Sequence, residues 1–173
     1  RNVYGYGIKV VDAVNSSFTR NRFVDFASTN SIGFAFAGGS GYHVSGNDFD
    51  THARAIVEVT GTTAFIFGNT IEGNITGIES PDYNFKGAFN VVGNHFESNT
   101  NSILVGTYPA SHMGGSYATA RGGAFTLIGN TFAVNGNGRI KIERADSVTV
   151  FGNQFGCGID YGTEVTNLVT FGN

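Results

Sequence analysis

The chain has little of several residue types, and each shortage narrows what it can be. In 173 residues there are no tryptophans, one methionine, two prolines and one cysteine. The single cysteine, Cys157, excludes an internal disulfide. No run of about 18 apolar residues is found, so we expect no transmembrane helix, and no signal-peptide pattern is visible. Charge is also sparse: the formal net charge is −3 and the lysines and arginines are scattered, so nothing indicates nucleic-acid binding.

What the sequence does have is glycine and a short repeated phrase. Its 26 glycines suit many tight corners and argue against a helical bundle. Six times, apolar residues lead into Gly-Asn, one variable residue and then usually Phe; the phrases are 44–49, 66–71, 91–96, 127–132, 150–155 and 170–173. A degenerate copy at 20–23 lacks the Gly. The repeated Asn residues lie 20 to 26 residues apart, except for one step of 36 residues. Such a period indicates stacked units, each too small to bury a core alone.

Between the repeated Asn residues the chain alternates apolar and polar side chains, as in Ile140–Glu143, which indicates strands. No long segment carries apolar residues at helical spacing. We therefore predict an all-β fold, a right-handed parallel β-helix of about seven coils with stacked Asn corners and coils about 4.8 Å apart. Residues 1–173 are predicted to form a single β-helix domain. Because the chain begins at Arg1 and stops inside a repeat at Asn173, we expect it to be a fragment of a longer protein.

Fixed offsets from the repeated Asn predict two further stacks. Stacked amides can bond to the coils above and below and so satisfy the backbone groups at the corners. The residues two positions after the Asn are predicted to form one buried internal stack: Phe49, Ile71, Phe96, Phe132 and Phe155. The residues five positions after it are predicted to form a second polar stack: His52, Asn74, Asn99 and Asn135.

One acidic column lies three residues after the repeated Asn and comprises Asp50, Glu72 and Glu97. In a parallel β-helix, neighbours in adjacent coils lie roughly 5 Å apart. Carboxylates at that spacing can carry out acid/base chemistry, but a position at a corner favours a solvated column, because corners rarely form a groove. Both interpretations stay open for this alternative acidic column.

A second column is predicted on a strand, where aligned apolar residues point inward. The outward residues in this alignment are Lys9, Glu58, Glu79, Leu104, Lys141 and Asp160. Glu58 and Glu79 are then neighbours on adjacent coils, and Arg54 lies on the same face. Each glutamate is expected to raise the pKa of the other, which would help one of them stay protonated as a general acid.

The 36-residue step adds an insertion loop, 106–123, directly after the strand that carries Leu104. Insertions in solenoids map to loops on one face, often the binding face. Aromatic rings stack on sugars, and carboxylates bond to their hydroxyls. We therefore predict a saccharide groove with Glu58 and Glu79 as catalytic residues, although the loop can equally contact a trimer neighbour. The predicted substrate-binding residues are Arg54, Asp82, Tyr108, His112 and Tyr117. The four scattered His residues lack metal-ligand spacing, so no metal and no cofactor is expected.

The Gly-Asn-x-Phe phrases, their period and the Asn stacks resemble the pectate-lyase-like parallel β-helix superfamily, and within it bacteriophage tailspikes and polysaccharide depolymerases. The resemblance implies a homotrimer, extracellular or on the virion surface, that binds and often cleaves a bacterial surface polysaccharide. The paired Asp-Asp of polygalacturonases is missing. So is the Asp-rich calcium cluster of pectate lyases, and the resemblance therefore does not extend to pectin cleavage.

Two classes of function remain open at this point. The first is an endo-acting depolymerase, either a glycoside hydrolase with paired carboxylates or a polysaccharide lyase. A lyase would need a base, for which Tyr108, His112 and Lys141 are candidates. The second is a non-catalytic module, either a glycan-binding domain or a structural stalk or adhesin, because fold alone does not give function.

Overall fold

The computed structural model describes residues 5–24, 30–58, 63–80, 87–106, 123–133 and 138–173. Every regular element in these residues is a β-strand, which confirms the predicted all-β class. All pairings between the strands are parallel. The described part of the chain has no helix with the length and apolarity needed to cross a membrane.

The strands fall into three groups that recur in the same order. The first group comprises β1 (Tyr6–Val11), β4 (Ile32–Ala37), β7 (Arg54–Glu58), β10 (Thr76–Ser80) and β13 (Asn101–Val105). The second comprises β2 (Ser17–Thr19), β5 (Tyr42–Ser45), β8 (Ala64–Phe67), β11 (Ala88–Val92) and β14 (Ala124–Ile128). The third comprises β3 (Arg22–Val24), β6 (Asp48–Asp50), β9 (Thr70–Glu72), β12 (His95–Glu97), β15 (Thr131–Phe132) and β17 (Gln154–Phe155). Two long strands, β16 (Arg139–Phe151) and β18 (Ile159–Phe171), are each continuous through the places that a strand of the first group and a strand of the second group occupy in the other repeats.

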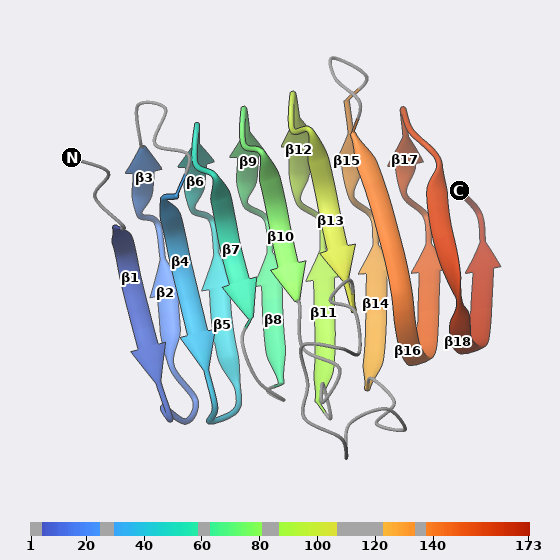
Figure 1. Ribbon diagram of the computed structural model, residues 1–173, viewed down its shortest axis with the longest axis horizontal. Helices are drawn as coiled ribbons and strands as arrows, with labels where there is room; N and C mark the ends of the chain where they lie inside the picture. The colour runs from blue at the N-terminus through green and yellow to red at the C-terminus, as the bar shows by residue number, and fades with distance from the viewer. Residues whose placement is uncertain (1–4, 25–29, 59–62, 81–86, 107–122, 134–137) are drawn as a thin grey trace.

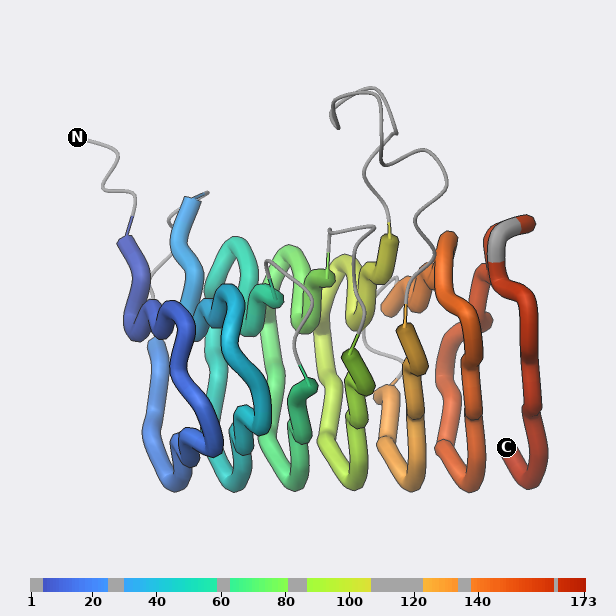
Figure 2. The backbone as a smooth tube through the Cα atoms, turned by 90° about the horizontal axis from the view of Figure 1, so that it is seen from below, coloured from blue at the N-terminus to red at the C-terminus, as the bar shows by residue number. Residues whose placement is uncertain are grey.

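Within each group, a strand pairs with its counterparts in the neighbouring repeats, so the chain returns to the same sheet position once per repeat. The ten strands of the first two groups form a 12-stranded sheet together with β16 and β18, and the third group forms a 6-stranded sheet. The 12-stranded sheet curls because the start of β16 pairs with β13 and its end pairs with β14 (Figure 1). Figure 2 shows successive turns of the chain lying side by side along the long axis. This all-parallel, curled arrangement is compatible with a parallel β-helix.

The repeated Asn residues form a continuous ladder, as predicted. The side-chain amide of Asn47 donates to Asn69 Oδ1 at 3.0 Å, and that of Asn69 donates to Asn94 Oδ1 at 2.8 Å. The same pattern continues from Asn21 to Asn173. The backbone N–H of each donating Asn bonds to the same oxygen, so one amide side chain satisfies two donors of the previous repeat.

The glycine before each repeated Asn supplies the corner. Gly46, Gly68 and Gly93 have φ of 61°, 60° and 60°, a left-handed conformation that glycine adopts without a Cβ penalty. The Asn that follows does not adopt positive φ. In the degenerate first copy, Arg20 stands where the other repeats have Gly and takes φ of 57°. The corner geometry therefore persists even where its preferred residue is lost.

The predicted internal stack lies in the core. Phe49, Ile71, Phe96 and Phe132 are buried, and they occupy equivalent positions of β6, β9, β12 and β15. Phe155 is only partly buried, because β17 is the last strand of its sheet. The second polar stack is also confirmed where it is described: His52 N–H donates to Asn74 Oδ1, and the Asn74 amide donates to Asn99 Oδ1. Asn135 lies outside the described residues.

Candidate functional site

The acidic column predicted after the repeated Asn exists in the structure. Asp50 pairs in register with Glu72, and Glu72 pairs in register with Glu97, on the neighbouring strands β6, β9 and β12. Paired positions on adjacent parallel strands lie about 4.8 Å apart. Glu72 is exposed, and Asp50 and Glu97 are half-buried at the same face. The site is thus a row of three carboxylates that solvent and ligand can reach.

Local sequence explains why the three carboxylates point outward together. Each of the three strands has only three residues, and its middle residue is the buried member of the internal stack. Because side chains alternate along a strand, the residues on either side of that anchor face outward. The backbone turns immediately afterwards: Thr51, Gly73 and Ser98 have φ of 61°, 67° and 54°. Each carboxylate therefore ends its strand at a left-handed corner.

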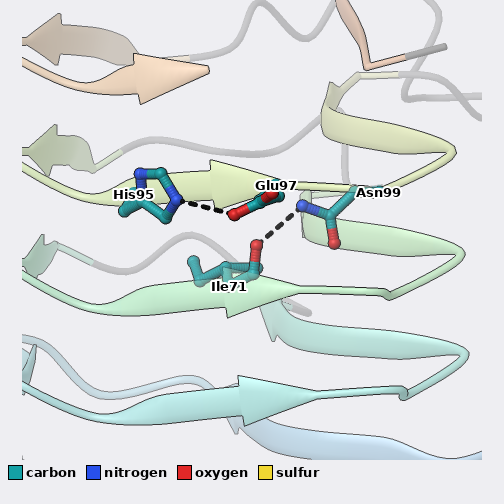
Figure 3. Close-up of polar contacts among 4 residues, drawn as sticks. All are labelled: Ile71, His95, Glu97 and Asn99. Atoms are coloured by element: carbon teal, nitrogen blue, oxygen red, sulfur yellow. Dashed lines mark hydrogen bonds and ion pairs between the residues drawn. The ribbon is translucent and has the colours of Figure 1, made fainter. Parts of the chain in front are cut away.

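A histidine faces the same side as the column. His95 lies two residues before Glu97 on β12, and its Nε2 is 3.2 Å from Glu97 Oε2 (Figure 3). An imidazole that carries its proton on Nε2 donates a hydrogen bond to this carboxylate. Behind the pair, the Asn99 amide donates to the Ile71 carbonyl at 2.8 Å and ties the corner of β12 to β9 (Figure 3). His95 and Glu97 thus stand beside a corner held by the second polar stack.

His95 is the residue whose role the sequence analysis missed. It occupies the variable slot of the repeated phrase, where Asp48 and Thr70 stand in other repeats and where no fixed residue type is required. The available signal was its spacing of two from Glu97, since residues i and i+2 of a strand share a face. A second ion pair of this sheet, Arg22 with Asp48 at 3.1 Å, is largely exposed and is expected to contribute little to stability.

Comparison with protein-family models, with curated proteins and with solved structures finds no match to this chain. The chemistry of the site is therefore what indicates a function. Within the described residues, no group of three or more His, Cys, Asp or Glu side chains is placed to hold a metal ion. Two carboxylates about one strand spacing apart, with an imidazole on one of them, are groups that can donate, accept and hold protons.

The prediction that Glu58 and Glu79 are outward-facing neighbours on adjacent coils is wrong. Glu79 pairs in register with Val57, and Glu58 lies one position further along β7. Glu58 is fully buried, with 0% exposure, and Ser80 Oγ donates to its Oε2 at 2.7 Å. The reason is the register: Ile56, and not Val57, pairs with Ile78, so Glu58 falls on the same buried side of β7 as Ile56. Glu58 therefore points into the core and cannot share a surface groove with Glu79.

Other members of that column are placed as predicted. Glu79, Leu104, Lys141 and Asp160 pair in register across β10, β13, β16 and β18. Lys141 forms an ion pair with Glu143 on its own strand. Lys9 also pairs into this row, through Ala35 and Val57. Four of the predicted substrate-binding residues, Asp82, Tyr108, His112 and Tyr117, lie outside the described residues, as does nearly all of the insertion loop 106–123.

The structure places Arg54 and Glu79, two of the predicted site residues, next to each other on the same face. Arg54 Nη1 lies 3.6 Å from Glu79 Oε2, and the Glu79 side chain is only 13% exposed. Burial raises the pKa of Glu79, and the neighbouring Arg54 guanidinium lowers it by a smaller amount. Glu79 was expected to have a raised pKa because of Glu58. The direction is confirmed, but the cause is burial.

The raised pKa of Glu79 leads to a prediction about stability and pH. A carboxyl whose folded pKa lies above its unfolded value, about 4.3 for Glu, stabilises the fold below that value and loses this contribution as the pH rises through the folded pKa. We therefore expect Glu79→Gln to match the wild type below about pH 4. As the pH rises further, the variant should become progressively more stable than the wild type, as measured by urea unfolding at several pH values.

Arg54→Gln provides the second arm of this experiment. Because the guanidinium lowers the pKa of Glu79, its removal should raise that pKa further in an NMR titration of the side-chain carboxyl. A difference between Glu79→Gln and wild type that does not change with pH would show that burial of the charge is not what perturbs Glu79.

Proposed function

We propose that this chain is a right-handed parallel β-helix of about seven coils, similar to tailspikes, and that it binds and cleaves a bacterial surface polysaccharide. The architecture is supported by the parallel pairing of each strand with its counterpart in the next repeat and by the two polar ladders. Its handedness follows from the strong preference of parallel crossover connections for the right-handed form.

The observation that carries the proposed activity is the register of Glu72 and Glu97. Retaining glycosidases hold two carboxyl groups about 5–5.5 Å apart, one as nucleophile and one as acid/base. Carboxylates on paired positions of adjacent parallel strands start from nearly the same spacing, about 4.8 Å. The proposed site thus moves from the predicted Glu58–Glu79 pair to the acidic column on β9 and β12.

The two glutamates are assigned different roles because their surroundings differ. His95 Nε2 lies 3.2 Å from Glu97 Oε2 and orients this carboxylate when that nitrogen carries the proton, so Glu97 is the proposed nucleophile toward the anomeric carbon. Glu72, in the middle of the column, donates a proton to the glycosidic oxygen as the bond to that oxygen breaks. Water then hydrolyses the glycosyl–Glu97 ester, with Glu72 as the general base.

The experiment is to follow chain length in a panel of capsular and O-antigen polysaccharides incubated with the protein. Glu72→Gln and Glu97→Gln should each reduce turnover by on the order of 10² or more. Both variants should still bind the glycan, because glutamine keeps the shape of the side chain. Glu143→Gln is the matched control: its carboxylate is 31% exposed, against 30% for Glu97, it has a cationic partner, and it stands on β16 outside the column.

Wild-type turnover in both column variants would exclude cleavage by this column. Binding of a glycan by the wild type without any cleavage would instead support the second candidate function, a glycan-binding module without catalysis. We also propose that the intact protein is a homotrimer located extracellularly or on the surface of a virion. A monomer of the full-length protein in sedimentation would contradict the trimer.

A further inference from the structure

A second face of the molecule carries an exposed aromatic ring beside two hollows. Strands β2, β5, β8, β11 and β14, the second group, contain no Asp, Glu, Lys or Arg at any position. The acidic column lies on the adjoining third group, across the corner formed by the Gly-Asn phrases. The strands of this second face therefore differ from the acidic column in carrying no Asp, Glu, Lys or Arg. Their side chains are mostly aromatic, aliphatic or short and polar.

Phe67 on β8 is the most exposed large hydrophobic residue in the middle of this face, with 57% of its surface accessible. Its partners in register are Ser45 and Val92, both smaller, so no ring covers it from either side. Two pairs of exposed rings on this face are stacked: Phe65 on His43 at 5.1 Å, and Phe151 on Phe171 at 4.8 Å. An aromatic ring left open to solvent between two smaller side chains offers its surface to a ligand.

Two hollows adjoin Phe67. One has a volume of about 340 Å³ and is lined by residues of β5, β8 and β11, including His43, Phe65 and Asn90. The other has a volume of about 380 Å³ and is lined by Thr19, Arg20, Ser45 and the two corner glycines Gly46 and Gly68. Both contain Ser45 and Phe67 in their lining. Each volume lies at the lower end of the range for small-molecule sites, which fits a single small ring.

The polar groups around the ring have hydrogen-bonding capacity to spare. The hydroxyls of Thr19 and Ser45 make no side-chain hydrogen bond to any described residue. The Asn90 amide makes one long bond, 3.5 Å, to the Ala88 carbonyl of its own strand. An aromatic surface flanked by hydroxyl and amide groups, with a single cation at one edge, matches the two sides of a pyranose: an apolar C–H face and a rim of hydroxyls.

We infer that Phe67 and its two flanking hollows bind consecutive uncharged sugar rings of a glycan. This inference takes its ligand class from the proposed function, but it locates binding on a different face from the acidic column. Uncharged sugars are favoured because the described residues that line the hollows include no carboxylate and no lysine, and their one cation, Arg20, lines only one of the two. A partner protein or a second copy of this chain would use the whole row, including Phe151 and Phe171, rather than the hollows beside one ring.

The test measures binding of neutral glucan, mannan and galactan oligosaccharides, and of uronate-containing oligosaccharides of the same length, by isothermal titration calorimetry. We expect a neutral series to bind, with Phe67→Ala raising its Kd at least tenfold, as for the removal of a central aromatic anchor. Asn90→Ala should raise the Kd by a smaller factor. The matched control is Phe151→Ala, which removes an exposed ring of the same row that borders neither hollow.

Each outcome separates this inference from the proposed cleavage. Unchanged binding in Phe67→Ala overturns the inference, even if Glu97→Gln abolishes turnover. Weakened binding in Phe67→Ala, together with normal turnover in Glu72→Gln and Glu97→Gln, supports the inference and removes only the proposed catalysis. Self-association in sedimentation that both Phe67→Ala and Phe151→Ala abolish, without binding of any oligosaccharide, identifies the face as a contact between copies and overturns the inference.

Discussion

Replacing Asn94 with Ala is expected to lower the free energy of unfolding by about 3–5 kcal/mol. The Asn94 side chain accepts hydrogen bonds from the Asn69 backbone N–H and amide, and donates to Asn130 Oδ1 and the Ile66 carbonyl. Its removal leaves the buried Asn69 N–H without an acceptor, which costs about 1–3 kcal/mol, and removes further bonds worth about 1 kcal/mol each. Urea unfolding followed by circular dichroism measures the loss.

Asn90→Ala is the control for this change. Asn90 lies four residues earlier in the same repeat, points outward from β11 and makes one bond of 3.5 Å. We expect its replacement to change stability by less than about 0.5 kcal/mol. Equal losses in the two variants would show that the ladder contributes no more than an ordinary surface amide.

The ladder and the internal stack could be predicted from the sequence because both depend on a fixed offset from one marker residue. Once Asn47, Asn69 and Asn94 are aligned, the period of two along a strand decides which neighbours face inward. The acidic column follows from the same count, three residues after the marker. These features are local to a single corner, where no irregularity separates the marker from the residue being placed.

The prediction that Glu58 and Glu79 are neighbours was wrong because the alignment behind it did not follow the length of the repeat. Asn47 and Asn69 are 22 residues apart, and the structure keeps this step along the whole repeat, pairing Arg54 with Thr76. The same step places Glu58 beside Ser80, 22 residues later, where a hydrogen bond joins them. Aligning on apolar neighbours instead gave a step of 21 residues and turned a buried glutamate into a surface one. A displacement of one residue reverses the side of the sheet.

Neither His95 nor Phe67 could be assigned a role by aligning repeats, because each stands where the repeats differ. Repetition identifies what every turn of the chain needs to fold: the corner glycine, the ladder amide and the inward anchor. Binding and chemistry require residues that a single repeat has and its neighbours lack. In this chain the residues proposed for these roles are the imidazole beside Glu97 and the exposed ring of Phe67.

Replacing Phe96 with Ala is expected to cost about 3–5 kcal/mol, the usual range for deleting a buried aromatic ring. Phe96 is 1% exposed, and its ring stacks on Phe132 with centroids 4.7 Å apart and planes 9° from parallel. It is the one inward residue of the three-residue strand β12, so no second anchor on that strand can compensate for its loss. The cavity would lie directly beneath His95 and Glu97, which flank Phe96.

Two controls separate the cavity from other effects of the change. Phe96→Ile should cost less than about 1.5 kcal/mol, because Ile71 fills the same position of the neighbouring strand β9. Phe67→Ala removes an identical ring from the surface, and we expect a change of about 0.5 kcal/mol or less. If Phe96→Ala lost less than about 1 kcal/mol in urea unfolding, the internal stack would not hold this sheet together. The carboxylates of β9 and β12 would then lack the rigid support that acid/base chemistry requires.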